Sequence, residues 1–214
     1  GLLLLSSFIT LLLQGLSKGQ KEGWSSNYIL ICFLLVIASG GGFIYRQLRT
    51  SSPLLNLSLF RYANFNASAI IAVIFGAGLY SSLYLTPLFL QTIQGLDATA
   101  SGFILLPGGL LLAIVFPISG SLSDRLDPWI LICMGLILFA LSSWLMIASD
   151  RHTSAGQFIY WVILGRVGMG LIMPSLNVAT FSALPPQLLT QASGTANFLR
   201  QLGGAFGVNL SSIF

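Results

Sequence analysis

Two arginines of this sequence stand inside long apolar stretches, where a charged side chain needs a specific environment. Arg166 and Arg200 each fall roughly 14 Å or more along a predicted helix, at a rise of about 1.5 Å per residue. Burying a guanidinium in an apolar medium costs at least a few kcal/mol, so each should face water or a hydrogen-bond acceptor. Snorkelling of the long side chain toward a polar surface is the alternative interpretation.

Polar and aromatic side chains recur at helical spacing around these arginines. One helix face is predicted by the offsets 0, 3, 7, 11 and 14 of Arg166, Met169, Met173, Asn177 and Thr180. The segments 65–93 and 188 onward have similar faces. We predict that the three faces meet at a water-accessible cavity for a small-molecule substrate. For the methionines, ordinary packing between helices is an equally good interpretation. The candidate cavity residues are Tyr80, Ser81, Tyr84, Arg166, Met169, Met173, Asn177, Asn197, Arg200 and Gln201.

No arrangement of residues in the sequence is typical of catalysis or metal binding. The one histidine, His152, lies in a polar turn without a second histidine, a cysteine or a carboxylate pair nearby. None of the Ser-Gly pairs is preceded by the glycine that a nucleophile elbow requires. All acidic residues fall in predicted loops, so no predicted span carries a carboxylate that could shuttle protons. We therefore expect no enzyme activity, no metal and no cofactor.

Long uncharged runs dominate the sequence and indicate that lipid surrounds it. The runs from Arg61 to Asp97, Asp97 to Asp124 and Asp127 to Asp150 each exceed the roughly 20 residues that a helix needs to cross a bilayer. Only 7% of residues are charged, 55% are hydrophobic and the mean hydropathy is +0.90. These values exclude a soluble domain, and the continuous runs favour helices over a closed barrel. The nine basic residues are scattered, so the formal net charge of +4 indicates a lipid-bilayer partner and no nucleic acid.

The apolar runs predict seven hydrophobic segments in an all-α, polytopic membrane bundle. Their predicted bounds are 1–16, 27–45, 65–93, 99–122, 129–148, 157–184 and 188 onward. The stretch 46–64 is too short and too interrupted to span, so we expect it to lie along the membrane surface. Lys and Arg favour the side of Arg46, Arg49 and Arg61 as cytoplasmic by only four residues to three. Because the sequence opens and ends inside apolar runs, we expect a fragment of a longer chain.

Several motifs resemble a known transporter family. The segment from Gly120 through Asp124 and Arg125 resembles the G-x-x-x-D-R/K-x-G signature loop of the major facilitator superfamily, with Asp127 in place of the last glycine. Further stretches resemble the fourteen-span drug:proton antiporters of the EmrB/QacA type, and the likeness covers nearly the whole chain. These stretches are Gly19 to Trp24, Pro53 to Phe65, Leu184-Pro185-Pro186 and Asn197-Phe198-x-Arg200.

Three glycines near the end of the chain add to this resemblance. Gly194, Gly203 and Gly207 reproduce the G-x8-G-x3-G part of the family's antiporter motif. The spacing of Gly203 and Gly207 also permits close contact between helices. We expect the three to be helix-packing glycines.

The resemblance implies a major facilitator fold in which this chain corresponds to spans seven to thirteen. Residues 1–45 would be two accessory transmembrane helices, 46–64 a cytoplasmic interfacial linker, and 65–214 an incomplete C-terminal transporter half-bundle. The missing N-terminal half of the same protein, with the acidic proton site, would be its partner.

The implied function is proton-coupled efflux of amphipathic, cationic or lipophilic drug-like compounds across the plasma (inner) membrane, by a multi-pass integral membrane protein. An exporter of a siderophore or other metabolite and a non-transporting scaffold subunit are the alternatives. A scaffold would bury its polar faces against other helices, whereas a transporter would leave them facing water.

Overall fold

The computed structural model describes residues 2–22, 26–49, 57–182 and 184–211. In these ranges the chain forms seven α-helices and two short 3-10 helices, and no strand. The prediction of an all-helical fold is therefore confirmed for the described residues. The α-helices are α1 (Leu2–Glu22), α2 (Asn27–Arg49), α3 (Ala63–Thr92), α4 (Ala98–Ser123), α5 (Pro128–Ile147), α6 (Ala155–Phe181) and α7 (Leu189–Ser211), and the 3-10 helices are η1 (Leu57–Arg61) and η2 (Pro186–Leu188).

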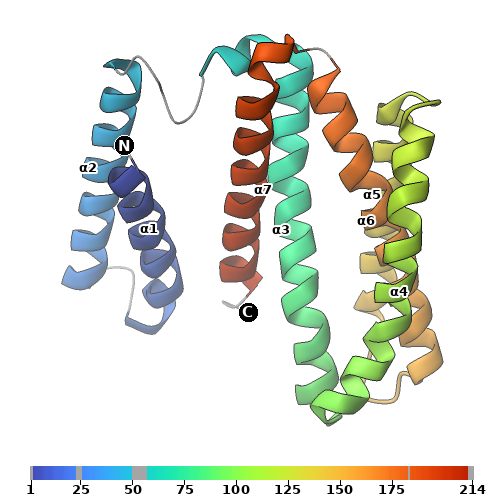
Figure 1. Ribbon diagram of the computed structural model, residues 1–214. Helices are drawn as coiled ribbons and strands as arrows, with labels where there is room; N and C mark the ends of the chain where they lie inside the picture. Colours follow the sequence, from blue (N-terminus) through green and yellow to red (C-terminus); the bar gives the residue numbers. More distant parts are fainter. Residues whose placement is uncertain (1, 23–25, 50–56, 183, 212–214) are drawn as a thin grey trace.

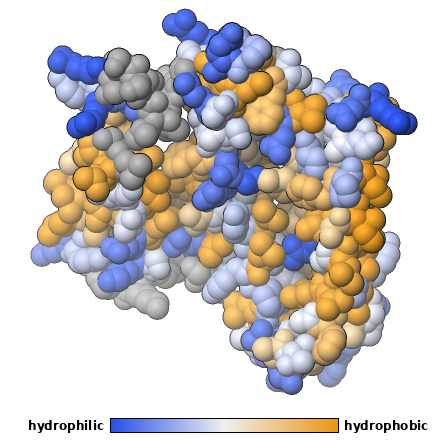
Figure 2. Space-filling view, viewed as in Figure 1, coloured by the Kyte–Doolittle hydropathy of each residue, from blue (hydrophilic) through white to orange (hydrophobic). Residues whose placement is uncertain are grey.

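Five of these helices, α2 to α6, are long and apolar enough to cross a membrane. In α1 the apolar stretch is shorter, from Leu3 to Gly19, and α7 contains several amides, glycines and an arginine. Many of the exposed side chains of the five helices are apolar: Ile137 and Trp144 of α5, for example, are 66% and 72% exposed. Hydrophobic atoms accordingly cover the outer flank formed by α4, while hydrophilic atoms gather at both ends and at the centre of the face in Figure 2.

The helices pair in an order different from their order along the chain. α3 packs most extensively on α7, and α6 packs on both α5 and α4 (Figure 1). A smaller contact between α3 and α6 joins the α3–α7 pair to the group of α4, α5 and α6. The hairpin of α1 and α2 lies on the other side of α7 and touches it through α1. The centre of the bundle is thus formed by α3, α6 and α7.

Glycines bring α3 and α7 together with almost no side chain between them. A Cβ on Gly203 would overlap the carbonyl oxygen of Val73, and one on Gly207 would lie 2.5 Å from the carbonyl oxygen of Ala77. Small residues at such contacts let two helix backbones approach closely in lipid. Gly194 differs from the other two glycines of the motif: a Cβ there would meet open space, because Gly194 lines a cavity between α6 and α7. Within the described residues Gly194 therefore meets no other helix, and its role as a packing glycine stays a prediction.

Acidic residues begin two of the long helices. Asp97 accepts a hydrogen bond from the backbone N–H of Ala100 at 2.6 Å, and Asp127 accepts one from Trp129 at 3.0 Å. Each carboxylate satisfies a donor that the first helical turn leaves free. Pro128 occupies the first position of α5, where its missing N–H is not needed. These caps explain why the acids lie between the spans and not within them.

The predicted interfacial linker lies partly outside the described residues. Its described end is η1, which places Leu59 in a buried cluster with Phe65 and Leu184. The hydrogen bond from the backbone N–H of Tyr62 to the carbonyl of Leu59 belongs to this separate turn, before α3 starts at Ala63. At the other end, α2 continues to Arg49, four residues beyond the predicted end at residue 45.

Candidate functional site

A polar cavity of about 260 Å³ lies between α6 and α7. We call it the α6–α7 cavity. Its polar lining combines one guanidinium, two amides and two hydroxyls, and its apolar lining is provided by short aliphatic side chains and a methionine. Among the described residues no carboxylate lines it. The lining residues are Ala72, Met173, Leu176, Asn177, Thr180, Ser193, Gly194, Ala196, Asn197 and Arg200.

Arg200 bridges the two walls of this cavity. Its Nη1 lies 2.8 Å from the sulfur of Met173 on α6, and its Nη2 donates to Oδ1 of Asn197 one turn earlier on α7. The backbone of Arg200 is fixed against α3, because a Cβ on Gly76 would overlap the Arg200 carbonyl oxygen. The guanidinium is half-buried and makes no ion pair within the described chain. It is held in place by neutral groups.

The hydroxyls around the cavity are mostly satisfied by their own helices. Thr180 donates to the carbonyl of Leu176 at 2.6 Å, and Thr195, just outside the lining, donates to Gln191 at 2.8 Å. Asn177, by contrast, is exposed, and its side chain lies in the lining. Besides the hydroxyl of Ser193, the groups left to contact a ligand are therefore Asn177, Asn197 and Arg200.

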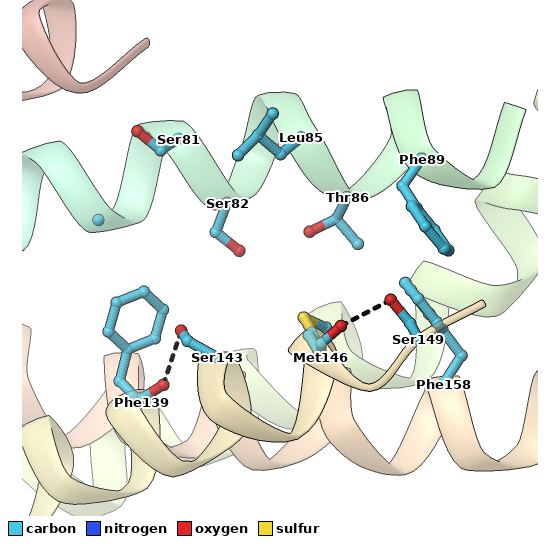
Figure 3. A pocket seen from close by; sticks show the side chains of 11 residues that line it. Ser81, Ser82, Leu85, Thr86, Phe89, Phe139, Ser143, Met146, Ser149 and Phe158 are labelled. Atoms are coloured by element: carbon cyan, nitrogen blue, oxygen red, sulfur yellow. Dashed lines mark hydrogen bonds between the residues drawn. The ribbon is translucent and has the colours of Figure 1, made fainter. Parts of the chain in front are cut away.

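A second cavity, of about 350 Å³, lies between α3 and α5. We call it the α3–α5 cavity. Figure 3 shows Ser82 and Thr86 of α3 pointing across the space toward Phe139 and Met146. Apart from its hydroxyls this cavity is apolar. It is lined by Gly78, Ser81, Ser82, Leu85, Thr86, Phe89, Phe139, Ser143, Met146, Ser149 and Phe158.

Arg166 reaches a small pocket of about 20 Å³ that shares five of its residues with the α3–α5 cavity. Its Nη1 lies 3.7 Å from the sulfur of Met169, which is only 2% exposed. The absence of a side chain on Gly108 of α4 makes room for this arginine, because a Cβ there would come within 3.0 Å of the Arg166 Cγ. Arg166 and Arg200 are thus both half-buried, each with a methionine sulfur as a neighbour, but they line different spaces.

The ten candidate residues divide between these spaces. Met173, Asn177, Asn197 and Arg200 line the α6–α7 cavity; Ser81 lines the α3–α5 cavity; Arg166 and Met169 line its small neighbour. Tyr80, Tyr84 and Gln201 are in none of these three linings, and the ring of Tyr80 packs over Gly204 instead. The three polar faces therefore do not meet at one shared cavity in this structure.

Two sets of residues that line the cavities were not predicted from the sequence. Ser82, Thr86 and Phe89 line the α3–α5 cavity at spacings of four and three residues, a helical stripe one position along from the face chosen around Tyr80 and Tyr84. Ser193 lines the α6–α7 cavity one turn before Asn197 on α7, and the same spacing could have identified it.

A buried network of three serine hydroxyls joins α4 to α6 beside the signature loop. Ser123 and Ser175 lie 2.8 Å apart, and both Ser175 and Ser119 donate to the carbonyl of Leu171, at 2.8 and 3.1 Å. All three side chains are less than 5% exposed. The network holds the end of α4 from which the loop emerges.

The signature loop itself is a tight and exposed turn. α4 ends at Ser123, the backbone N–H of Arg125 returns to the carbonyl of Leu122 at 3.1 Å, and α5 begins at Pro128. Asp124 and Arg125 are exposed, and a Cβ on Gly120 would meet open space. Both charged side chains are therefore accessible on the surface.

The turn between α5 and α6 is organised by one carboxylate. Asp150 accepts hydrogen bonds from the hydroxyl of Thr153 and from the backbone N–H of His152, both at 2.9 Å. The bond from Thr153, followed by that from His152, lowers the pKa of the Asp150 carboxyl. No group of three or more metal-ligating side chains occurs in the described part of the chain. The hydrogen bonds of Asp150 thus stabilise the loop between α5 and α6.

Long apolar helices with polar cavities between them define this molecule as a polytopic, integral membrane protein. The chain belongs to the Major Facilitator Superfamily, a family of transporters and not of enzymes, whose sequence profile matches residues 1–208. This match confirms the predicted resemblance to the family and the predicted fold class.

Several curated relatives of the chain are named as bacterial resistance proteins. It is 30% identical over 191 residues to the lincomycin resistance protein LmrB of Listeria innocua, covering 89% of this chain and 41% of that protein. It is 29% identical to the colistin resistance protein EmrB of Acinetobacter baumannii, covering 91% of this chain and 38% of that protein. It is 27% identical to the tetracenomycin C resistance and export protein of Streptomyces glaucescens, covering 97% of this chain and 38% of that protein. The chain thus spans about two fifths of the length of these relatives.

Proposed function

We propose that this chain is part of a proton-coupled exporter of amphipathic or lipophilic drug-like compounds in the plasma (inner) membrane. The observation that carries the proposal is the α6–α7 cavity, which puts a guanidinium, two amides and a flexible thioether beside aliphatic side chains in a membrane bundle. Such a mixture suits ligands that are part polar and part apolar. The resistance proteins among the relatives support the same class of substrate.

A complete transport pathway needs a second wall opposite this cavity. The chain spans about two fifths of the relatives' length, so the proposed exporter has an N-terminal half of the same protein facing α6 and α7. That half would also supply the carboxylate for proton coupling, because Asp97, Asp124, Asp127 and Asp150 all lie at helix ends or in turns in this chain. A carboxylate within a span is the usual proton carrier of such transporters.

Efflux from cells tests the proposal directly. The intact protein is produced in a bacterial strain that lacks its major efflux pumps, and the retention of fluorescent amphipathic dyes is measured with and without a protonophore. We expect faster dye loss that the protonophore abolishes, and slower loss in the Asn177→Ala protein. Gln157→Ala, an exposed change in the first turn of α6, is the matched control and should transport normally. Dye retention equal to that of the empty strain would refute the proposal.

Water access distinguishes a transporter from a scaffold subunit. Cys32 and Cys133 are replaced by alanine, a single cysteine is placed at Asn177, and a charged thiol reagent is applied to membranes. We expect modification at Asn177, slowed by a bound dye. A cysteine at Ile137, which is 66% exposed on the apolar flank, should stay unmodified because it faces lipid. An unreactive cysteine at Asn177 would support the scaffold.

A further inference from the structure

We infer that the α6–α7 cavity binds the oxyanion, best a carboxylate, of an amphipathic substrate, and that Arg200 and Asn197 form its binding site. The inference rests on the proposed function and narrows it to acidic amphiphiles. Cationic compounds, which the family resemblance suggested as substrates, are the class that this cavity disfavours. Three features of the cavity lead to this assignment: its free donors, the absence of a carboxylate from its described lining, and the sign of the charges around it.

The first feature is the number of hydrogen-bond donors that remain free. A guanidinium has five N–H donors in a planar fork, and Arg200 uses one toward the sulfur of Met173 and one toward Asn197. Donors therefore remain for a ligand. A carboxylate is the group whose two oxygens match this fork best.

The second feature is the orientation of the Asn197 amide. Because Oδ1 of Asn197 accepts from Arg200, the amide oxygen is occupied and the two N–H donors of Nδ2 are directed elsewhere. Thr180 likewise uses its hydroxyl proton within α6. Asn197 and Arg200 together thus offer the cavity donors and no free carbonyl oxygen. An acceptor-rich ligand satisfies them, whereas an ammonium group finds no anionic partner in this lining.

The third feature is the sign of charge inside the bundle. Within the described parts of α2 to α7, the charges that lie well away from the helix ends are Arg166 and Arg200, both positive. Asp97 and Asp127 cap the first turns of α4 and α5, and neither lines the cavity. An anion entering the cavity is therefore attracted, and a cation is repelled, in a medium where such interactions are weakly screened. The apolar part of the substrate contacts Ala72, Leu176 and Met173.

The test compares two dyes that share one ring system. Carboxyfluorescein and a rhodamine ester have the same xanthene core, but at neutral pH the first is an anion and the second a cation. Binding to the purified intact protein in detergent is measured by fluorescence anisotropy, so that the readout does not depend on transport. We expect carboxyfluorescein to bind about tenfold more tightly than the rhodamine, the difference that one charge-assisted hydrogen bond provides.

Two substitutions locate the effect at the proposed residues. Asn197→Asp is nearly isosteric and puts a carboxylate beside Arg200. It should therefore weaken the binding of carboxyfluorescein about tenfold and strengthen the binding of the rhodamine. Arg200→Lys keeps the positive charge but loses the planar fork of N–H donors. It should therefore weaken the binding of the anionic dye less than Arg200→Gln does. Asn64→Asp adds the same charge at the exposed start of α3 and serves as the matched control, with both affinities unchanged.

The outcomes separate this inference from the proposed function. Equal affinities for the two dyes, tighter binding of the rhodamine, or an Asn197→Asp protein that binds carboxyfluorescein normally would each overturn the anion site, whether or not cells export dye. Binding of carboxyfluorescein that depends on Arg200, in a protein that exports neither dye from cells, would support the site and remove the exporter. A carboxylate from elsewhere in the protein that occupies the Arg200 fork would appear as the first of these results.

Discussion

The guanidinium of Arg200 on α7 contacts the thioether of Met173 on α6, with Nη1 and Sδ 2.8 Å apart. The two helices have little other contact, since α7 packs mainly on α3 and α6 mainly on α4 and α5. Arg200 therefore crosses a space that the helix backbones leave open, and that space is the α6–α7 cavity. The position of this one side chain depends on how α7 is held by α3.

Gly76→Ala should displace Arg200 without touching its side chain. The new methyl group would overlap the Arg200 carbonyl oxygen, so α7 must move away from α3 at the cavity. Overpacking of this kind costs about 1–3 kcal/mol of unfolding free energy. We expect weaker dye binding together with a lower melting temperature in detergent. Gly41→Ala on α2, where a Cβ meets nothing, is the control; unchanged dye binding in Gly76→Ala would show that the close contact does not position Arg200.

Gly203→Ala should destabilise the protein, whereas Gly194→Ala should not. A methyl group at Gly203 would overlap the Val73 carbonyl oxygen, and separating α3 from α7 should cost about 1–3 kcal/mol. At Gly194 the methyl group meets open space, so alanine should be neutral or should stabilise the helix by up to about 1 kcal/mol. Thermal unfolding of the two proteins in the same detergent measures the difference. Equal melting temperatures would contradict the packing described for Gly203.

Ser175→Ala should weaken the junction between α4 and α6. The change removes the hydroxyl that meets Ser123 at 2.8 Å and Ser119 at 3.4 Å. Hydrogen bonds between helices in membrane proteins contribute about 0.6 kcal/mol on average and at most about 1.7 kcal/mol, so a loss in this range is expected. Ser143→Ala, whose hydroxyl bonds only to Phe139 on its own helix, is the control for unfolding measurements. A loss of the same size in both proteins would show that the network adds nothing.

The turn after α5 should depend on pH through Asp150. Its hydrogen bonds lower the pKa of the carboxyl below the ordinary value of 3.8, so the folded turn favours the ionised form. The resulting stabilisation is present above the ordinary pKa and is lost as the pH falls through the lower pKa of the folded state. Since Asp150 is exposed, the effect should be small. Melting temperatures of the protein and of Asp150→Asn should differ above that range and converge below it; a difference that grows on acidification would contradict the assignment.

Helix content and family could be predicted from the sequence because both depend on local patterns. The uncharged runs bounded by Arg61, Asp97, Asp124, Asp127 and Asp150 predict helices with ends close to those observed, since three of the acids, Asp97, Asp124 and Asp127, are cap residues. The segment predicted from residue 188 onward forms α7, but its amides and its arginine lower its hydropathy, so it is not among the five helices that are apolar enough to cross a membrane.

Side-by-side packing could not be predicted, because periodicity identifies a helix face but not the helix that the face meets. Tyr80 shares a face with Ser81 and Tyr84, yet α3 is turned so that Tyr80 covers Gly204 while Ser82 and Thr86 reach the cavity. The partition of Arg166 and Arg200 between two spaces likewise follows from contacts of α4 and α7 with α6 and α3, which are distant in sequence.

The pairing of α3 with α7 and of α4 with α6 has a consequence for how the polypeptide can be divided. Each partner is separated from the other by the turn at residues 148–154, so most of the contacts that hold α6 and α7 in place are made to helices encoded before that turn. The unbroken backbone at this turn contributes only a loop between α5 and α6. Two gene fragments, ending and restarting within this turn, should therefore yield polypeptides that find each other in the bilayer and restore the bundle by complementation.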